Sequence, residues 1–328
     1  MALEVKEETL DSFFDCCSNR DDVLHWPNIF ILPAWLEAWW ECFGDEEESC
    51  LYSIWEGGRL AGLAPLRQKG DTARFIGSAD VCDYLDFIIA PGKEKEFFMA
   101  LLPVLRNQGI HKLELESQHP VSRVFEGVYS APAEDRFPAK FSFTREDLTF
   151  EKPLPGTWED YLASLSKKQR HEVRRKLHRL ERETGSYCYR DIDQEEAVGE
   201  FIPSFLALFG RNPEKANFLT AKREQFFKRL ITLTAREGFA RFGLLEIDDE
   251  VAAAVLYFDY RGRVYLYNSG YVPEYGHLSA GLLSKVQCLK YSIERGSTVF
   301  DFLKGQEAYK SRLGAKAVPV YRVTAELE

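Results

Sequence analysis

One succession of segments occurs twice in this chain, and the repetition limits the folds that the chain can adopt. The later copy spans residues 239–314, with strand-like runs at 241–247, 251–258 and 264–270, a helical pattern at 282–293 and a last run at 298–303. The earlier copy has the corresponding segments at 51–55, 60–66, 74–78, 93–108 and 112–116. Two copies of a strand–strand–strand–helix–strand succession indicate a duplication and predict two units of one architecture.

The length and composition are typical of a soluble globular protein with two medium-sized domains. The 328 residues are 45% hydrophobic and 29% charged, so each half is long enough to bury a core of its own. The stretch 151–156 contains two prolines and a glycine, which interrupt regular structure. We therefore predict one domain over residues 1–154 and a second over residues 155–328.

Charge and cysteine usage bear on the compartment and the partners. The net charge of −10 does not favour a chain that coats nucleic acid or an anionic membrane. No apolar run approaches the roughly 20 residues that a membrane-spanning helix needs, and the acidic N-terminal residues do not form a signal peptide. The 7 cysteines and 6 histidines show no zinc-ligand spacing, and the cysteines are expected to be reduced thiols. We predict a cytoplasmic protein without membrane insertion and without a metal.

Periodicity and capping residues predict the remaining elements. Helices are expected at 33–42, 157–163, 166–183, 195–209 and 221–237, with Pro33, Thr157 and Ser166 at favourable N-terminal positions. Strand-like alternation is present at 141–150, and residues 316–327 are expected to form a last edge strand.

The turn between the third strand and the helix of the later copy is the first candidate site. It reads Tyr275-Gly-His-Leu-Ser-Ala-Gly281. A helix start presents backbone N–H groups and a favourable dipole to an anion such as a pyrophosphate, and glycine permits close approach. The plainer interpretation is a turn with a helix cap. The residues expected to bind a phosphate-bearing ligand are Asn268, Ser269, Gly270, Tyr271, Gly276, His277, Leu278, Ser279, Ala280 and Gly281.

The second candidate site is the segment 300–315, which begins on the last strand of the later copy and continues beyond it. Loops at the carboxyl ends of strands in α/β sheets are common ligand sites. The alternative is a solvated loop held by ion pairs. The ionisable side chains gathered here are Asp301, Lys304, Glu307, Tyr309, Lys310 and Arg312. The strand that leads into them is expected to lie beside residues 264–269.

Four motifs, in order along the chain, carry a resemblance to a known family. Asp301-Phe-Leu-Lys-Gly, followed by Glu307-Ala-Tyr-Lys-Ser-Arg-Leu-Gly-Ala, resembles the closing signature of the BioF2-like and CelD-type (BcsL) acetyltransferases, relatives of the FemAB aminoacyltransferases. Residues 30–39 resemble the family's opening helix, the Asp-Tyr-Leu-Asp sequence at 83–86 resembles one of its strand starts, and residues 166–175 resemble its basic helix. The chain departs from the pattern at Leu313, where an aromatic residue is expected, and in the less glycine-rich donor turn.

The resemblance implies an α/β (α+β) protein of two tandem GNAT-like (acyl-CoA N-acyltransferase) domains, each a mixed, mostly antiparallel sheet flanked by helices. It implies that the C-terminal domain binds acyl-CoA as co-substrate and that the acceptor lies in the cleft between the domains. The implied activity is transfer of an acetyl or longer acyl group to an amine or hydroxyl of a polysaccharide or cell-envelope precursor, so the partner is a small molecule or saccharide.

Two alternatives to this activity stay open. One is a FemAB-like transferase that uses aminoacyl-tRNA, and it alone would make nucleic acid a partner. The other is a non-catalytic binding protein that kept the fold.

Acyl transfer requires a base, an acid and stabilisation of developing charge. We assign removal of the acceptor's proton to Asp83, Asp86 or Glu307. Protonation of the leaving sulfur is assigned to Tyr309, and Lys310 is expected to offset negative charge or to bind the acceptor. A backbone N–H group near residues 268–271 is expected to polarise the thioester carbonyl. Each acid can instead be an ordinary ion-pair partner.

The first copy and the basic helix complete the predictions. Pro91, which has no N–H group, lies just before the first copy's helix, and Glu94 and Glu96, which repel phosphate, lie at its start. We therefore predict that the first copy does not bind a nucleotide-type donor. The basic helix at 166–183 has three interpretations: a solvated face with ion pairs, a lining for an anionic acceptor or CoA phosphates, or an RNA-binding surface.

Overall fold

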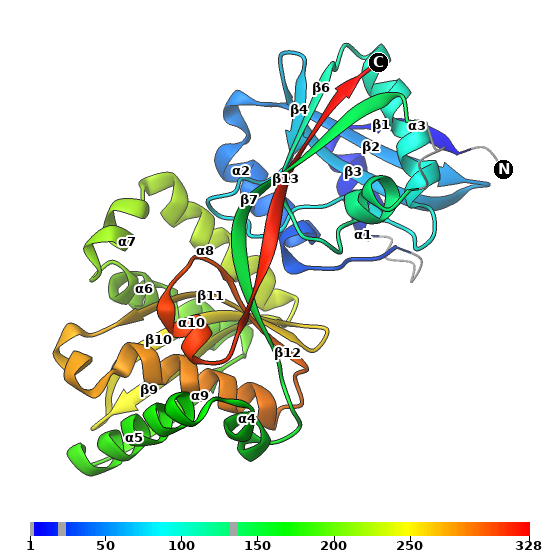
Figure 1. Ribbon diagram of the computed structural model, residues 1–328. Coiled ribbons are helices and arrows are strands. Elements are labelled where there is room, and N and C mark those ends of the chain that lie inside the picture. Colours follow the sequence, from blue (N-terminus) through cyan, green and yellow to red (C-terminus); the bar gives the residue numbers. More distant parts are fainter. Residues whose placement is uncertain (1–2, 19–23, 132–136) are drawn as a thin grey trace. The chain divides into compact units, whose positions relative to one another are not determined.

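The fold consists of two compact units joined by continuous strands. A computed structural model describes residues 3–18, 24–131 and 137–328 (Figure 1). Unit 1 comprises residues 1–147 and 319–328, and unit 2 comprises residues 148–318. Two long strands, β7 (Ala139–Pro153) and β13 (Lys316–Leu327), contribute residues to both units.

Unit 1 is built on strands in the order β1-β2-β3-β4-β6-β13-β7, with β5 beside β3. The pairs from β1 to β4 are antiparallel, and β4 and β6 are parallel. Its elements are β1 (Glu4–Glu8), α1 (Leu10–Ser18), η1 (Ile29–Ile31), α2 (Pro33–Phe43), η2 (Gly44–Glu46), β2 (Glu48–Glu56), β3 (Arg59–Lys69), β4 (Thr72–Phe75), β5 (Ile88–Ile89), α3 (Glu94–Asn107), β6 (Lys112–Gln118), the π-helical η3 (Phe125–Tyr129) and parts of β7 and β13.

Unit 2 follows the order β7-β12-β11-β10-β9-β8. All of these pairs are antiparallel except β11–β12, which is parallel. Its elements are α4 (Trp158–Ser164), α5 (Lys167–Glu183), β8 (Tyr187–Ile192), α6 (Glu195–Phe209), α7 (Pro213–Phe218), α8 (Ala221–Arg236), β9 (Ala240–Ile247), β10 (Glu250–Tyr260), β11 (Arg263–Tyr271), η4 (Pro273–Leu278), α9 (Ala280–Glu294), β12 (Val299–Lys304) and α10 (Ala308–Arg312).

The two units repeat one topology, which confirms the predicted fold class. In unit 1, β2, β3, β4, α3 and β6 follow one another, and in unit 2, β9, β10, β11, α9 and β12 do so. In each series the last strand pairs in parallel with the third. The hairpin turns also agree: Gly57 and Gly58 have φ of 55° and 82°, and Asp248 and Asp249 have φ of 50° and 66°. Two successive positive φ values give the turn twist that suits antiparallel strands.

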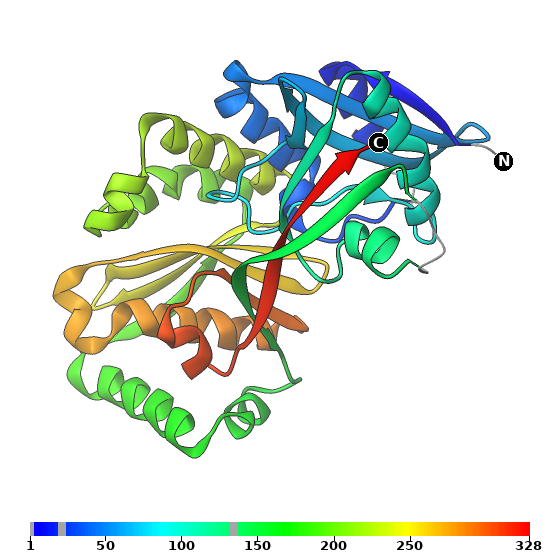
Figure 2. The same ribbon diagram turned by 45° about the horizontal axis from the view of Figure 1, so that its top comes forward.

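Helices cover both faces of the unit 2 sheet. Helix α9 lies on one face, and α6 and α8 lie on the other (Figure 2). The buried side of α9 presents Leu283, Val286, Leu289 and Ile293 to the core. Burial of a side chain of this kind stabilises the fold by about 1.5–3 kcal/mol. Helix α9 is therefore packed firmly against the sheet along most of its length.

Three local predictions need correction. Residues 316–327 form β13, but β13 lies between β6 and β7 and is not an edge strand. The sequence 151–153 does not interrupt the chain's regular structure, because it is the end of β7. The segment 300–315 is not wholly a loop, since residues 308–312 form α10.

Candidate functional site

The site in unit 2 begins where β11 and β12 separate. The two strands pair in parallel over Arg263–Tyr265 and Val299–Asp301, as the sequence predicts. Beyond these residues the structure records no ladder pair between them. Strand β11 bulges against β10 at Tyr267, where Leu256 pairs with Asn268 but Tyr257 pairs with Leu266. A bulge leaves its extra residue out of the ladder and redirects the strand, so β11 turns away from β12 at this point.

A buried carboxylate shapes the end of β12. Asp301 is fully buried, and its Oδ1 accepts the N–H of Leu303 at 2.9 Å. Its Oδ2 lies 3.1 Å from Nη1 of Arg263. Leu303 adopts φ of 61°, a left-handed conformation that a branched side chain adopts rarely. The Asp301 carboxylate therefore stabilises the bend that leads from β12 into the short loop 305–307 before α10.

Lys310 fixes this loop from inside. Its side chain is 2% exposed. Its ammonium group donates to the carbonyl of Leu303 at 3.1 Å and to that of Lys304, and lies 3.0 Å from Oε2 of Glu307. An ammonium group has three N–H donors, so these three contacts use its full capacity. Glu307 itself remains half-exposed, with 57% of its side chain accessible.

Tyr309, on α10, packs its ring against Phe302 at a centroid distance of 6.1 Å. Burial raises the pKa of its hydroxyl well above the usual range. The hydroxyl therefore stays protonated at neutral pH, the state required of a proton donor.

Two lysines of the site were missed by the sequence analysis. Nζ of Lys285, on the second turn of α9, donates to the carbonyl of Gly281 at 2.6 Å and lies 5.3 Å from the centre of the Tyr309 ring. Nζ of Lys215, on α7, donates to the carbonyl of Ser269 at the end of β11. Burial, and next the charge of Lys215, lower the pKa of Lys285 to about 7. A signal for Lys285 was present, because it follows Leu282 by three residues and precedes Leu289 by four, on the apolar stripe of the helix.

The predicted donor turn adopts a conformation suited to an anion. After η4, Ser279 takes a left-handed conformation with φ of 62°, and α9 begins without a side-chain cap. Within the described part of the chain, the N–H groups of Ala280 and Gly281 have no recorded acceptor. Nζ of Lys176, on α5, lies 2.7 Å from Oγ of Ser279. A helix N-terminus carries partial positive charge, so an ammonium group beside it favours a bound anion.

The glycines of the turn have different surroundings. A Cβ atom at Gly281 would lie 2.8 Å from the ring of Tyr271, whereas one at Gly276 would meet no atom within 4 Å. A side chain at Gly281 would therefore displace the ring of Tyr271, whereas Gly276 faces open space. His277 is exposed and its Nδ1 lies 2.8 Å from the carbonyl of Glu274, while Leu278 is buried.

A pocket of about 640 Å³ lies between α5 and α9. Its apolar wall includes Val173, Leu282 and Val286, and its basic lining includes Lys176 and Arg312. The volume falls within the range of about 300–1,000 Å³ that is usual for small-molecule sites. Lys176 connects this pocket to the start of α9. Among the described residues, no cluster of histidine, cysteine, aspartate or glutamate has the composition of a metal site.

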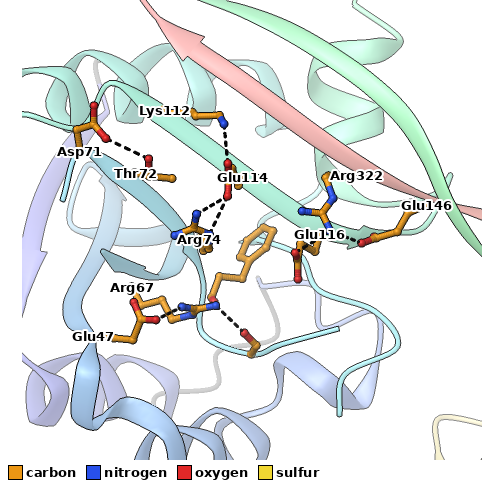
Figure 3. Close-up of polar contacts among 12 residues, drawn as sticks. Glu47, Arg67, Asp71, Thr72, Arg74, Lys112, Glu114, Glu116, Glu146 and Arg322 are labelled. Atoms are coloured by element: carbon orange, nitrogen blue, oxygen red, sulfur yellow. Dashed lines mark hydrogen bonds and ion pairs between the residues drawn. The ribbon is translucent and has the colours of Figure 1, made fainter. Parts of the chain in front are cut away.

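In unit 1, a segment of the chain itself is hydrogen-bonded to the end of β6, the counterpart of β12. The N–H of Leu85 donates to the carbonyl of Ser117 at 3.1 Å, and Nε2 of Gln118 donates to the carbonyl of Leu85 at 2.7 Å. The segment around Leu85 is therefore held by hydrogen bonds to the end of β6. Figure 3 shows the ion pairs of the same sheet, in which Arg74 on β4 contacts Glu114 on β6.

The two candidate acids of unit 1 lie in this segment. Asp86 is 2% exposed, and its carboxylate accepts the backbone N–H groups of Arg123, at 2.9 and 3.0 Å, and of Phe87, at 2.9 Å. Burial raises its pKa to about 8. These contacts connect two parts of unit 1. Asp83 is half-buried in the same segment. The structure thus gathers Glu307, Tyr309 and Lys310 in unit 2, whereas Asp83 and Asp86 belong to unit 1.

Residues 167–311 match the family described as the acetyltransferase (GNAT) domain. The fold is GNAT-like. The matched range includes α5, both separating strands and the start of α9, and it indicates an acyltransferase domain. No helix in the described ranges has the length and apolar character to cross a bilayer.

Three solved structures share the fold. FemX covers 99% of this chain and 97% of its own, with a TM-score of 0.65 and 12% identity. A conserved protein of unknown function from Bacteroides thetaiotaomicron covers 99% and 100%, with a TM-score of 0.59 and 12% identity. The C-terminal domain of an Agrobacterium fabrum protein described as a lysylphosphatidylglycerol synthetase covers 86% and 84%, with a TM-score of 0.56 and 10% identity. No curated protein matches the sequence.

Proposed function

We propose that unit 2 transfers an acetyl or longer acyl group from acyl-CoA to an amine or hydroxyl group. The observation that carries this proposal is the start of α9. Two backbone N–H groups, the hydroxyl of Ser279 and the ammonium group of Lys176 converge there, next to the separated ends of β11 and β12. The resemblance to BioF2-like and CelD-type acetyltransferases supports an acceptor on a polysaccharide or cell-envelope precursor.

The residues present fit a phosphate-bearing co-substrate. The N–H groups of Ala280 and Gly281 and the side chains of Ser279 and Lys176 would hold the phosphates. These contacts are charge-assisted hydrogen bonds, which are among the stronger ones in proteins. The neighbouring pocket between α5 and α9 would take apolar parts of the same ligand. We propose that unit 1 does not bind such a ligand, because a segment of its own chain is hydrogen-bonded to the end of β6.

The proposed reaction is an acyl transfer in which one bond to the carbonyl carbon forms and the carbon–sulfur bond breaks. The nucleophilic nitrogen or oxygen of the acceptor attacks the thioester carbonyl, the carbon–sulfur bond breaks, and the thiolate takes a proton from Tyr309. The acceptor's proton passes to Glu307, whose carboxylate is half-exposed. Glu307 is a better candidate for this step than Asp86, whose carboxyl group is enclosed by backbone N–H groups of unit 1. Lys310 positions Glu307, and a backbone N–H near residues 268–271 would polarise the carbonyl.

Calorimetric titration with acetyl-CoA and with longer acyl-CoAs tests the proposal. We expect binding of one acyl-CoA per chain, with affinity that reports the preferred acyl length. Absence of binding to every acyl-CoA would contradict the proposal. A titration with aminoacyl-tRNA or RNA then separates the two alternatives: binding that weakens steeply with salt supports a FemAB-like transferase, and no binding supports a binding protein that kept the fold.

A further inference from the structure

Lys285 is buried and Lys215 is half-buried, and the ammonium group of each has few acceptors. Lys285 is 9% exposed, and its recorded acceptor is the carbonyl of Gly281. The recorded acceptor of Lys215 is the carbonyl of Ser269, and its Nζ lies 4.9 Å from the ring centre of Phe209. Each ammonium group has three N–H donors, so each retains capacity for further hydrogen bonds. Neither forms an ion pair with a carboxylate in the part of the chain that the structure describes.

The charge around this pair is unbalanced. The charges of Lys215 and Lys310 act on Lys285, and the carboxylate of Glu307 acts on both Lys215 and Lys285. Lys310 already contacts that carboxylate at 3.0 Å. Burial lowers the pKa of Lys215 and of Lys285, because a charged group loses its hydration. An anion placed between the two lysines would supply both the missing acceptors and the missing charge.

The chain brings the two lysines together through close packing of the end of β11. A Cβ atom at Gly270 would lie 2.7 Å from the carbonyl group of Leu208, so the absence of a side chain lets the end of α6 approach the strand. Helix α7 follows at once, capped by the side chain of Asn212, and it carries Lys215 to Ser269. Lys285 reaches the same region from α9.

The pair is separate from the phosphate site proposed for the donor. Lys176 lines the pocket between α5 and α9, together with Leu282, Leu283 and Val286, but Lys285 does not line it. Lys285 instead faces Tyr309, next to the groups that the proposed chemistry uses. An anion held here would belong to the second substrate.

We propose that Lys215 and Lys285 bind an oxyanion group, a carboxylate or a phosphate, of the acyl acceptor. The assignment of this anion to the acceptor rests on the proposed acyltransferase function. The acceptor class is thereby narrowed to amines or alcohols that also carry a carboxylate or a phosphate, such as amino acids or sugar phosphates.

Anion binding is measured in the Lys176→Ala background, which removes the one charged side chain of the phosphate site proposed at the start of α9. Calorimetric titrations with potassium phosphate and with potassium acetate, at constant ionic strength and pH 7.5, test the two chemical classes. We expect one of the two anions to bind with 1:1 stoichiometry. Adding Lys215→Met or Lys285→Met should weaken this binding by about tenfold or more, since each removes a charge-assisted hydrogen bond. Lys228→Met removes an exposed lysine that pairs with Glu224 on α8 and should change nothing.

Proton uptake gives a second readout, which a purely structural role would not produce. The groups that face Lys285 are Lys215 on α7, Glu307, Tyr309 and Lys310 around α10, and Cys288 on α9. An anion that binds beside Lys285 raises its proton affinity, so binding at pH 7.5 should take up a proton. Titrations in buffers with different ionisation enthalpies measure this uptake, and Lys285→Met should abolish it.

Two results would overturn the inference: no binding of either anion, or binding that both methionine variants retain in full. Circular dichroism and urea unfolding show whether each variant is folded. If Lys215→Met does not fold, Lys215→Gln replaces it in the titrations. The experiments distinguish an error in this inference from an error in the proposed function. If acyl-CoA does not bind but the anion does and depends on both lysines, the lysine site stands and the acyltransferase proposal is wrong.

Discussion

Nζ of Lys176, on the basic helix α5, lies 2.7 Å from Oγ of Ser279 at the start of α9. This contact joins two segments that the sequence analysis considered separately, the basic helix and the donor turn. Much of the helix carries its own ion pairs, such as Arg175 with Glu172 and Arg179 with Glu183. Lys176 differs from these because its ammonium group also reaches a helix N-terminus.

Replacement of Lys176 by alanine should weaken acyl-CoA binding by about tenfold or more, because a hydrogen bond to a charged group is lost. The affinity should also become less sensitive to salt, since one cation no longer contacts the phosphates. Calorimetric titrations at two salt concentrations measure both effects. Arg182→Ala is the matched control, because Arg182 lies on the same helix with 77% of its side chain exposed. Equal weakening in both variants would indicate a diffuse effect of charge and not a specific contact.

The buried amine of Lys285 should make stability depend on pH. Its pKa falls to about 7 in the folded chain, whereas an unfolded lysine has a pKa of about 10.4. Between these values the unfolded state binds a proton that the native state does not, so stability rises as pH increases through this window. Relative to Lys285→Met, the free energy of unfolding of the wild type should rise by up to about 1.4 kcal/mol per pH unit.

Urea unfolding of both proteins at pH 6, 7, 8 and 9 measures this difference. Lys228→Met, at an exposed position, provides the control, and its free energy of unfolding should depend on pH in the same way as that of the wild type. A difference between wild type and Lys285→Met that stays constant from pH 7 to pH 9 would show that Lys285 keeps an ordinary pKa.

Gly270 should be essential for stability, although it lies in a predicted binding segment. A methyl group there would overlap the backbone of Leu208 and Phe209, with distances of 2.7 and 2.8 Å. Gly270→Ala should therefore destabilise the protein by about 1–3 kcal/mol, as overpacking does. Gly276→Ala, in the same predicted segment, should change stability by less than about 0.5 kcal/mol, because its added Cβ meets no atom within 4 Å. Similar unfolding midpoints for the two variants would contradict this difference.

The structural features that depend on local sequence patterns could be predicted from the sequence. The duplication, the fold class and several helices follow from periodicity and capping. Helix α5, for example, begins after Ser166, whose side chain accepts the N–H of Gln169 in a capping box. These signals lie within a few residues of one another, so no knowledge of the tertiary fold is needed to interpret them.

Features that depend on distant segments could not be predicted in this way. Whether residues 316–327 form an edge or an inner strand depends on β6 and β7, which are far away in sequence. Lys215 and Lys285 become a pair only because α7 and α9 meet near the end of β11. Lys310 was predicted from its motif, but its hydrogen bonds were not. Its ammonium group donates to the carbonyl groups of Leu303 and Lys304, and the position of these groups depends on the bend after Asp301.

Asp86 should stabilise unit 1 in its protonated form. Its pKa is raised to about 8 by burial, whereas an unfolded aspartate has a pKa of about 3.9. Between these values the native state holds a proton that the unfolded state releases, so the contribution of Asp86 to stability falls as pH rises. Asp86→Asn keeps an acceptor oxygen for the N–H of Arg123 and does not titrate. Relative to the wild type, this variant should therefore gain stability between pH 5 and pH 8 in urea unfolding. Asp86→Ala removes the acceptor and should cost about 1–3 kcal/mol at either pH. Unchanged acyl-CoA binding in both variants is expected, and a loss of binding without a loss of stability would instead favour a direct role of Asp86 in the site.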